Sequence, residues 1–277
     1  MSTVVFLGGG RITSAILAGL LLGKTKHRLI VHDRDRGKLR DLKKRYAVAV
    51  EPDLTRAVEQ ADMLIVAVRP SSVRELLGMV GKVIGKMNRP LLGRQRFGRE
   101  LLAISLAAGV PLRVLKKEAG PHVKWARAMP SPVCRSGRGL TALTFSRSLP
   151  HADRKRVQEF FSSFGQVVEI PENKFDAFTV TYSCSHGYHA LAALARTAQE
   201  VGLDRRTALL ASAHALADGI IAWRDGKDSL ESLLEEAATP GGIAAATAAA
   251  MDAAGYGRAV RRGVAAGLRR AHANAGK

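Results

Sequence analysis

Apolar residues in the first half of the chain come in short runs that polar, helix-like stretches separate. Runs of strand length lie at residues 4–7, 28–32, 47–50, 63–68, 101–106 and 125–129. Helical patterns lie between them, at 14–22, 38–45, 54–60 and 72–84. Strands that alternate with helices in this way predict an α/β fold with a doubly wound parallel sheet of the Rossmann type.

The pattern changes in the second half. Residues 165–170 form one more predicted strand, and from Glu172 onward alanine-rich helical stretches follow one another. We therefore predict two domains, an α/β domain over residues 1–170 and an all-helical domain over residues 171–277. The apolar faces of the helical part are wide enough to need a partner, so we expect them to be buried against a second subunit.

Three glycines, Gly8 to Gly10, connect the first strand to the first helix. Gly8 permits a tight turn, and Gly10 lets the backbone approach a pyrophosphate closely. The N–H groups at the helix start, Arg11 and Ile12, can bind the anion, while Thr13 stands where the full fingerprint has a third glycine. This predicts a dinucleotide site in the α/β domain, although such glycine clusters also occur as simple turns.

The end of the second strand bears on the choice of cofactor. Asp33 lies about twenty residues beyond the glycines and can accept hydrogen bonds from the ribose of NADH. Arg34, with Lys38 one helical turn further on, can instead pair with the 2′-phosphate of NADPH. The sequence leaves NADPH or NADH open, and Asp33 and Asp35 can also simply cap the next helix.

Two further strand ends border the same predicted site. The strand at 63–68 stops at a proline, which places Val68, Arg69 and Pro70 at the carboxyl edge of the sheet, where ligands of such folds bind. Ala108 and Gly109 follow the strand at 101–106 and complete the predicted cofactor contacts. The basic segment 85–99 reads as a loop, for which we have no functional interpretation.

Composition narrows the class of protein. No apolar run reaches the ~18 residues of a membrane span, and the first strand begins too near Met1 to leave room for a cleaved signal, so we expect a cytoplasmic protein. The net charge of +19 is spread along the chain and only 5% of residues are aromatic, which disfavours nucleic acid as the main partner. Cys134 and Cys184 form neither a disulfide framework nor a zinc pattern.

The order of motifs along nearly the whole chain resembles the pyrroline-5-carboxylate reductase family, which makes proline from a cyclic imine. The resemblance rests on residues 8–12, 67–70, 105–110, 127–130, 139–143, 239–242 and 255–258. It implies an N-terminal dinucleotide domain, a helical C-terminal domain that intertwines in a homodimer, and an active site between them.

The Pro-Gly-Gly segment 240–242 precedes an alanine-rich helix. Backbone N–H groups of Gly241, Gly242 and Ile243 can therefore surround the carboxylate of an amino-acid-like substrate. A plain turn between two helices is the alternative interpretation of the same residues.

Departures from the family gather where substrate would lie. Residues 182–188 read Tyr-Ser-Cys-Ser-His-Gly-Tyr where the family has Ser-Gly-Ser-Gly-Pro-Ala-Tyr, so only Tyr188 clearly matches, and Leu191 lacks the family's hydroxyl group. Other family residues are replaced by Arg11, Arg69, Ser131 and residues 243–244. We expect reductase chemistry to be kept and activity on the five-membered family substrate to be weak or absent.

Three side chains near this segment are candidates for catalysis. His186 and His189 can supply a proton to an imine nitrogen, because an unperturbed imidazole titrates near physiological pH, and Tyr188 lies between them. Both histidines can equally be core or surface residues. Cys184 completes a Cys-x-His-x-x-His pattern, but no further ligand cluster is evident and no metal is predicted.

These observations predict an NAD(P)H-dependent reductase of a cyclic imine carboxylate, acting as a homodimer or a larger assembly of the same chain. One alternative is a related hydroxy-acid dehydrogenase, but its catalytic lysine has no counterpart, since Lys174 precedes the core helix. A second alternative is a dinucleotide-binding or nucleic-acid-associated protein without catalysis.

Overall fold

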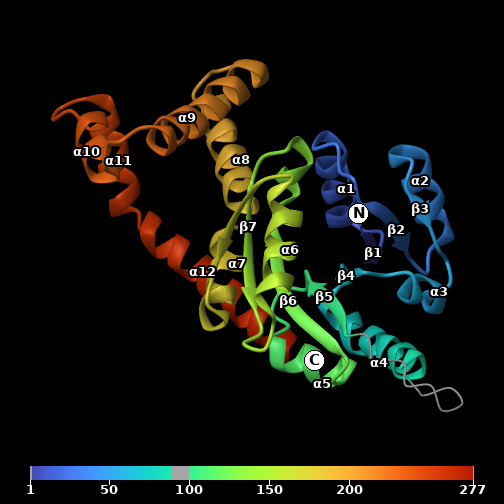
Figure 1. The fold of residues 1–277 in the computed structure, drawn as a ribbon. Helices are drawn as coiled ribbons and strands as arrows, with labels where there is room; N and C mark the ends of the chain where they lie inside the picture. The colour runs from blue at the N-terminus through green and yellow to red at the C-terminus, as the bar shows by residue number, and fades with distance from the viewer. Residues whose placement is uncertain (1, 89–99, 277) are drawn as a thin grey trace, which may run out of the picture. The chain divides into compact units, whose positions relative to one another are not determined.

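A computed structural model of the chain describes residues 2–88 and 100–276 (Figure 1). Its first part is an eight-stranded sheet with the strand order β3-β2-β1-β4-β5-β6-β7-β8. The strands are β1 (Thr3–Leu7), β2 (Arg28–His32), β3 (Ala49–Val50), β4 (Met63–Val66), β5 (Leu101–Ser105), β6 (Val123–Pro130), β7 (Leu140–Phe145) and β8 (Gln166–Glu169). The order 3-2-1-4-5-6 is that of the Rossmann fold, so the predicted doubly wound α/β sheet is confirmed.

The sheet is mixed rather than purely parallel. Neighbouring strands pair in parallel, with Val5 of β1 opposite Ile30 of β2 and Leu64 of β4, except that β6 and β7 pair antiparallel. The sequence did not predict β7. A short connection, the 3₁₀ helix η1 (Pro132–Ser136), joins the two strands, and such a connection permits antiparallel pairing without a crossover helix.

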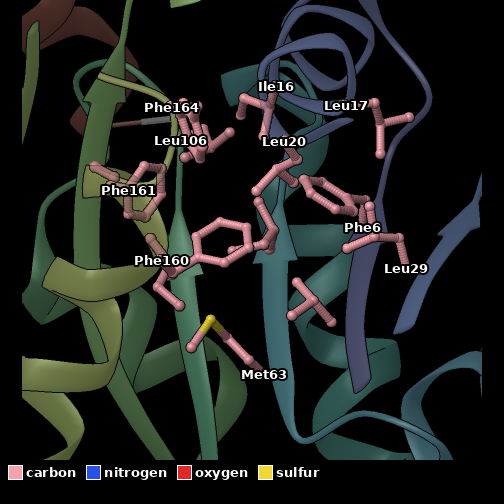
Figure 2. Packing of buried hydrophobic residues seen from close by; sticks show 14 of the residues in the cluster. Phe6, Ile16, Leu17, Leu20, Leu29, Met63, Leu106, Phe160, Phe161 and Phe164 are labelled. Carbon is pink, nitrogen blue, oxygen red and sulfur yellow. The ribbon is translucent and has the colours of Figure 1, made fainter. Parts of the chain in front are cut away.

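Helices cover both faces of the sheet. One core contains buried residues of α1 (Arg11–Leu22), α2 (Arg36–Tyr46) and α6 (His151–Ser162). Figure 2 shows part of it, including Phe160, Phe161 and Phe164, whose rings contact one another edge to face. The second core contains residues of α3 (Leu54–Glu59), α4 (Pro70–Met87) and α5 (Leu112–Ala119). Two buried faces explain why the central strands read as continuous apolar runs.

Helix α4 corrects one sequence interpretation. The predicted loop over 85–99 is wrong for residues 85–87, which end this helix. Ile84 is buried and Met87 packs against the second core, so packing outweighs the cost of about 1 kcal/mol for Gly85 within a helix. The rest of the predicted loop, residues 89–99, lies outside the described residues.

The remainder of the chain is helical, as predicted. It comprises η2 (Glu172–Lys174), α7 (Phe175–Thr181), α8 (Ser185–Glu200), α9 (Arg205–Asp225), α10 (Leu230–Ala237), α11 (Ile243–Ala253) and α12 (Tyr256–Ala275). Among the residues described, no helix combines the length and apolar character needed to span a bilayer.

Contacts within the chain define two compact units. The first contains Met1–Tyr182 together with Gly267–Lys277, and the second contains Ser183–Ala266. The C-terminal end of α12 therefore packs with the sheet unit. The boundary after residue 170, drawn from sequence, stays a prediction about where the dimerisation region begins.

The second unit buries little apolar surface within the chain. Its buried residues are small, namely Ala195, Ala208 and Ser212. Its exposed large apolar side chains include Tyr188, Val201, Leu210, Ile220, Ile221, Trp223, Leu234, Ile243 and Tyr256. So much apolar surface on one unit is typical of a protein–protein interface.

Candidate functional site

The glycine turn follows β1 at the carboxyl edge of the sheet. Gly8 has a φ of +112°, and a Cβ there would lie 2.7 Å from the carbonyl oxygen of Ala67, so only glycine fits. The N–H of Gly8 donates to the His32 carbonyl (2.8 Å), and the Thr13 hydroxyl donates to the Gly8 carbonyl (2.6 Å). The turn is thus fixed from both sides.

Gly10 lies at the N-cap of α1, and no side chain caps this helix start. A Cβ on Gly10 would have nothing within 4 Å, in contrast to Gly8. Arg11 is exposed and Ile12 packs partly against the core. An uncapped helix start beside open space suits an anionic group, because the first N–H groups of a helix have no intrahelical partner.

Asp33 is bonded to the glycine turn itself. Its Oδ2 accepts the N–H of Gly9 (2.7 Å), and its Oδ1 accepts the N–H of Asp35 (2.9 Å). The Lys38 ammonium lies 3.9 Å from Oδ2, and the Asp33 side chain is only 14% exposed. The carboxylate therefore lies where the end of β2 meets the turn, as the sequence predicted.

The neighbouring charged residues take different roles. Arg34 pairs with Glu75 of α4 at 3.2 Å, and both side chains are largely exposed, so the pair is weak. Asp35 is the N-cap of α2 and accepts the N–H groups of Gly37 and Lys38. The N–H of Lys38, followed by that of Gly37, lowers the pKa of the Asp35 carboxyl. The capping alternative is thus confirmed for Asp35, whereas Asp33 bonds the turn.

Residues 67–70 lie beside the turn. The N–H of Ala67 donates to the Leu7 carbonyl (2.8 Å), and Val68 lies close to Gly8, 3.2 Å from the position of a Cβ on that glycine. Arg69 is an exposed N-cap with extended backbone, and Pro70 is the first residue of α4. A proline suits this position because the first helical N–H has no intrahelical partner.

Ala108 and Gly109 belong to the loop between β5 and α5, at the same edge of the sheet. Gly109 has a φ of +75°, and a Cβ on it would overlap the carbonyl of Ala271 in α12. The Ala108 carbonyl accepts the Asn274 amide (3.2 Å). These contacts with α12 were not visible in the sequence.

A buried arginine lies behind this loop. Arg127 of β6 is 1% exposed and bonds Glu172 at 3.1 Å and Asp176 at 2.8 Å, with its guanidinium over the Phe175 ring. Glu172 also accepts the N–H of Leu112, at the start of α5 (2.9 Å). Sequence reasoning treated Arg127 only as part of a motif. Its position within an apolar strand was the available sign, because a charge there needs buried partners.

The candidate catalytic residues lie in the second unit. His186, Tyr188 and His189 stand on the first turns of α8, and all three are exposed in the single chain. The part of the chain that the structure describes holds no cluster of His, Cys, Asp and Glu able to bind a metal ion.

The Pro-Gly-Gly segment forms the start of α11. Gly241 has a φ of +78°, Gly242 is the N-cap, and no side chain caps the helix. Ile243 is 90% exposed. The N–H of Gly242 already donates to the Thr239 carbonyl (2.9 Å), so a carboxylate at this turn would have to share or replace that bond.

A cavity of about 270 Å³ lies elsewhere, at the amino ends of β5 and β6. It is lined by Glu100, Lys116, Lys124 and Ser148, among others. Lys124 pairs with Glu100 (2.9 Å) and Asp153 (3.3 Å), and the hydrogen bond that it donates to Glu100 is the main cause that raises the pKa of this lysine. Its charge is thus already matched, and the cavity is at the edge opposite to the glycine turn.

Two segments of the chain match models of known protein families. Residues 3–87 match the family model "NADP oxidoreductase coenzyme F420-dependent", and residues 172–274 match "Pyrroline-5-carboxylate reductase dimerisation". Pyrroline-5-carboxylate reductase of Synechocystis is 30% identical over 95% of this chain and 95% of its own length. The chain belongs to the pyrroline-5-carboxylate reductase family. It is thus an oxidoreductase of the type that the motif order suggested.

Solved structures of the family share the fold. Pyrroline carboxylate reductase of Plasmodium falciparum, solved with NADP bound, superposes with a TM-score of 0.85 at 19% identity and covers 99% of this chain and 98% of its own. The Streptococcus pyogenes pyrroline-5-carboxylate reductase gives a TM-score of 0.84 at 22% identity, with 98% of each chain covered. At these identities the likeness concerns the fold.

Within this reductase fold the structure brings one group of predicted residues together. Those from the α/β part line the carboxyl edge of one sheet: Gly8, Gly10, Arg11, Ile12, Asp33, Arg34, Val68, Arg69, Pro70, Ala108 and Gly109. The predicted catalytic and substrate residues belong to the second unit, on α8 and at the start of α11. Their roles stay predictions.

Proposed function

We propose that this reductase uses NADPH or NADH to reduce a cyclic imine that carries a carboxylate. The observation that carries the proposal is the match to a pyrroline-5-carboxylate reductase over 95% of the chain. The reaction adds a hydride to the imine carbon and a proton to its nitrogen, so the C=N double bond becomes a C–N single bond. A bound nicotinamide supplies the hydride.

The chain's own residues suit the binding of such a cofactor. The uncapped start of α1 and the open space beside Gly10 fit a pyrophosphate, and the fixed φ of Gly8 keeps the turn open toward it. Asp33, which bonds Gly9 at the end of β2, would accept the ribose hydroxyls. Arg34 can leave its exposed pair with Glu75 at little cost and bind a 2′-phosphate, so NADP, which the Plasmodium falciparum relative binds, suits this chain.

The second unit supplies the groups for the substrate. We assign the substrate carboxylate to the backbone of Gly241, Gly242 and Ile243, where the helix start offers a partial positive charge. His186 or His189 donates the proton to the nitrogen, and Tyr188, the motif residue between them, stays a further catalytic candidate. The replaced family residues around 182–188 favour an imine other than the five-membered family substrate.

The protein acts as a homodimer. Residues 172–274 match a dimerisation region, and the second unit exposes large apolar side chains such as Ile220 and Trp223. A symmetric interface between identical chains would bury such a surface, so its exposure in the single chain supports assembly of identical chains. Light scattering coupled to size-exclusion chromatography is expected to give at least twice the chain mass, and a monomer at micromolar concentration would contradict this.

A substrate panel tests the enzymatic proposal. Oxidation of NADPH and NADH is followed with five- and six-membered cyclic imines, each with and without the carboxylate. We expect turnover of carboxylated imines other than pyrroline-5-carboxylate, which is itself turned over slowly. Equal rates without the carboxylate would overturn the substrate site. Fast turnover of pyrroline-5-carboxylate would show that the replaced residues are dispensable, and tight NADPH binding without any turnover would favour a non-catalytic protein.

A further inference from the structure

The loop between β5 and α5 is seated against the C-terminal end of α12. The Asn274 amide donates to the Ala108 carbonyl at 3.2 Å, across 166 positions of sequence. At Gly109 the two backbones meet so closely that a Cβ would overlap the Ala271 carbonyl. All of these residues belong to the first compact unit. The helix end therefore packs directly on the loop.

The end of α12 is itself anchored to the helices beside it. Arg74 of α4 donates through Nη2 to the Ala275 carbonyl (3.3 Å), and its Nη1 lies 2.9 Å from Glu118 of α5. The last carbonyls of a helix lack intrahelical partners and carry a partial negative charge, so a guanidinium suits this place. The Arg74 side chain thus joins α4, α5 and α12, and Asn274 is the residue directly before the anchored Ala275.

The other contacts of the loop place it at the proposed cofactor edge. The N–H of Leu106 donates to the Val66 carbonyl (2.9 Å), at the end of β4. The N–H of Leu112 donates to Glu172, which Arg127 holds in turn. Between these two fixed ends the loop has local bonds of its own, from the Ala107 N–H to the Ser105 hydroxyl (3.2 Å) and from the Val110 N–H to the Ala107 carbonyl (3.5 Å). Among the side-chain contacts described, Asn274 alone bonds the Ala108 carbonyl, and it ties the middle of the loop to α12.

We infer that Asn274 is a positioning residue for the dinucleotide, acting through the Ala108 carbonyl. This inference rests on the proposed function, because only a protein that binds NADPH or NADH would have a cofactor at this loop. Asn274 belongs to α12, and its hydrogen bond is to the backbone of the loop. Loss of the bond lets residues 107–110 move and weakens cofactor binding, while the reacting groups are untouched.

The test measures binding of NADPH to the full-length protein by calorimetry, together with the KM for NADPH and kcat. Asn274→Asp puts an oxygen opposite the Ala108 carbonyl, and we expect Kd and KM for NADPH to rise by about 3- to 10-fold, the range for one lost hydrogen bond. Asn274→Ala gives a smaller rise in the same direction. In both variants kcat at saturating NADPH stays near the wild-type value.

Two further variants separate positioning from general stability. In Asn274→His the ring Nδ1 stands as many bonds from Cα as the amide nitrogen, so it can donate to Ala108 and restore the NADPH affinity. His272→Ala changes an exposed residue of the same helical turn and leaves both constants unchanged. A melting temperature for each variant confirms that it is folded.

The outcomes distinguish this inference from the proposed function. Unchanged NADPH affinity in both Asn274→Asp and Asn274→Ala, with a wild-type protein that binds NADPH, overturns the role of Asn274 and leaves the reductase proposal standing. A lower melting temperature without a change in Kd also overturns it. A wild-type protein that binds neither NADPH nor NADH overturns both.

Discussion

Gly9 donates its backbone N–H to the Oδ2 of Asp33 over 2.7 Å, and this bond joins the glycine turn to the end of β2. A Cβ on Gly9 would lie 2.9 Å from Leu42, so the turn is also pressed against α2. The acidic residue that the sequence suggests for a ribose thus has a second task, because it holds the turn that we propose as the pyrophosphate site.

Replacement of Gly10 tests the phosphate site without disturbing the fold. Gly10→Asp is expected to abolish NADPH and NADH binding, since the new carboxylate enters the space of the pyrophosphate. An aspartate at position 10 is also a favourable N-cap for α1, so the melting temperature stays equal or rises. Calorimetry with both cofactors measures the loss of binding. Intact cofactor affinity in Gly10→Asp would refute the phosphate site.

Replacement of Gly8, in contrast to that of Gly10, tests the backbone geometry of the turn. Gly8→Ala is expected to destabilise the protein by about 1–3 kcal/mol, because of its φ of +112° and the Ala67 carbonyl 2.7 Å from the Cβ position.

Asp33→Asn tests the choice of cofactor. The amide oxygen can still accept the N–H of Gly9, although the N–H of Asp35 loses its acceptor, and the negative charge that opposes a 2′-phosphate is gone. We expect the affinity for NADPH relative to NADH to increase by about tenfold, or roughly 1.4 kcal/mol. An unchanged ratio of the two dissociation constants would remove Asp33 from the ribose site.

Arg34→Ala tests the opposite contribution. If Arg34 binds the 2′-phosphate, its loss weakens NADPH by roughly 1 to 3 kcal/mol and leaves NADH nearly unaffected. Glu75→Gln is the matched control, because it removes the negative charge that Arg34 pairs with at 3.2 Å and should leave NADPH binding equal or tighter. Equal losses for NADPH and NADH in Arg34→Ala would exclude this role.

Gly242→Val tests the substrate carboxylate site. A Cβ at this N-cap would lie 3.0 Å from the Thr239 carbonyl, and the β-branched side chain fills the space the carboxylate approaches. We expect a strong rise in KM for a carboxylated imine with little change in KM for NADPH. Gly263→Ala, on α12 with open space around it, serves as control. A KM that does not respond would place the carboxylate elsewhere.

Arg127→Ala tests the buried ion pairs. Removal of a guanidinium that is 1% exposed leaves Glu172 and Asp176 without their partner, and breaking such a pair costs about 3–5 kcal/mol. Urea unfolding measures the loss. Asp176→Asn keeps an acceptor for Arg127 and should cost much less. A small effect of Arg127→Ala would mean that water replaces the lost contacts.

The sequence by itself determined the features that depend on local periodicity and on short motifs. The apolar runs indicated the parallel strands, the glycines after β1 indicated the turn, and the helical pattern from residue 72 indicated the start of α4 within two residues. These features follow from backbone geometry over a few neighbours, which each segment carries in its own residues. The order of the motifs indicated the family.

The tertiary structure decided the contacts between residues far apart in sequence. Asp33 meets Gly9 across 24 positions, Arg127 meets Glu172 across 45, and Asn274 meets Ala108 across 166. Such pairs depend on strand order and on which helix packs on which face, and neither is encoded in the periodicity of a single segment. The sequence could therefore locate the candidate cofactor edge, whereas the residues that hold it in place are decided by packing.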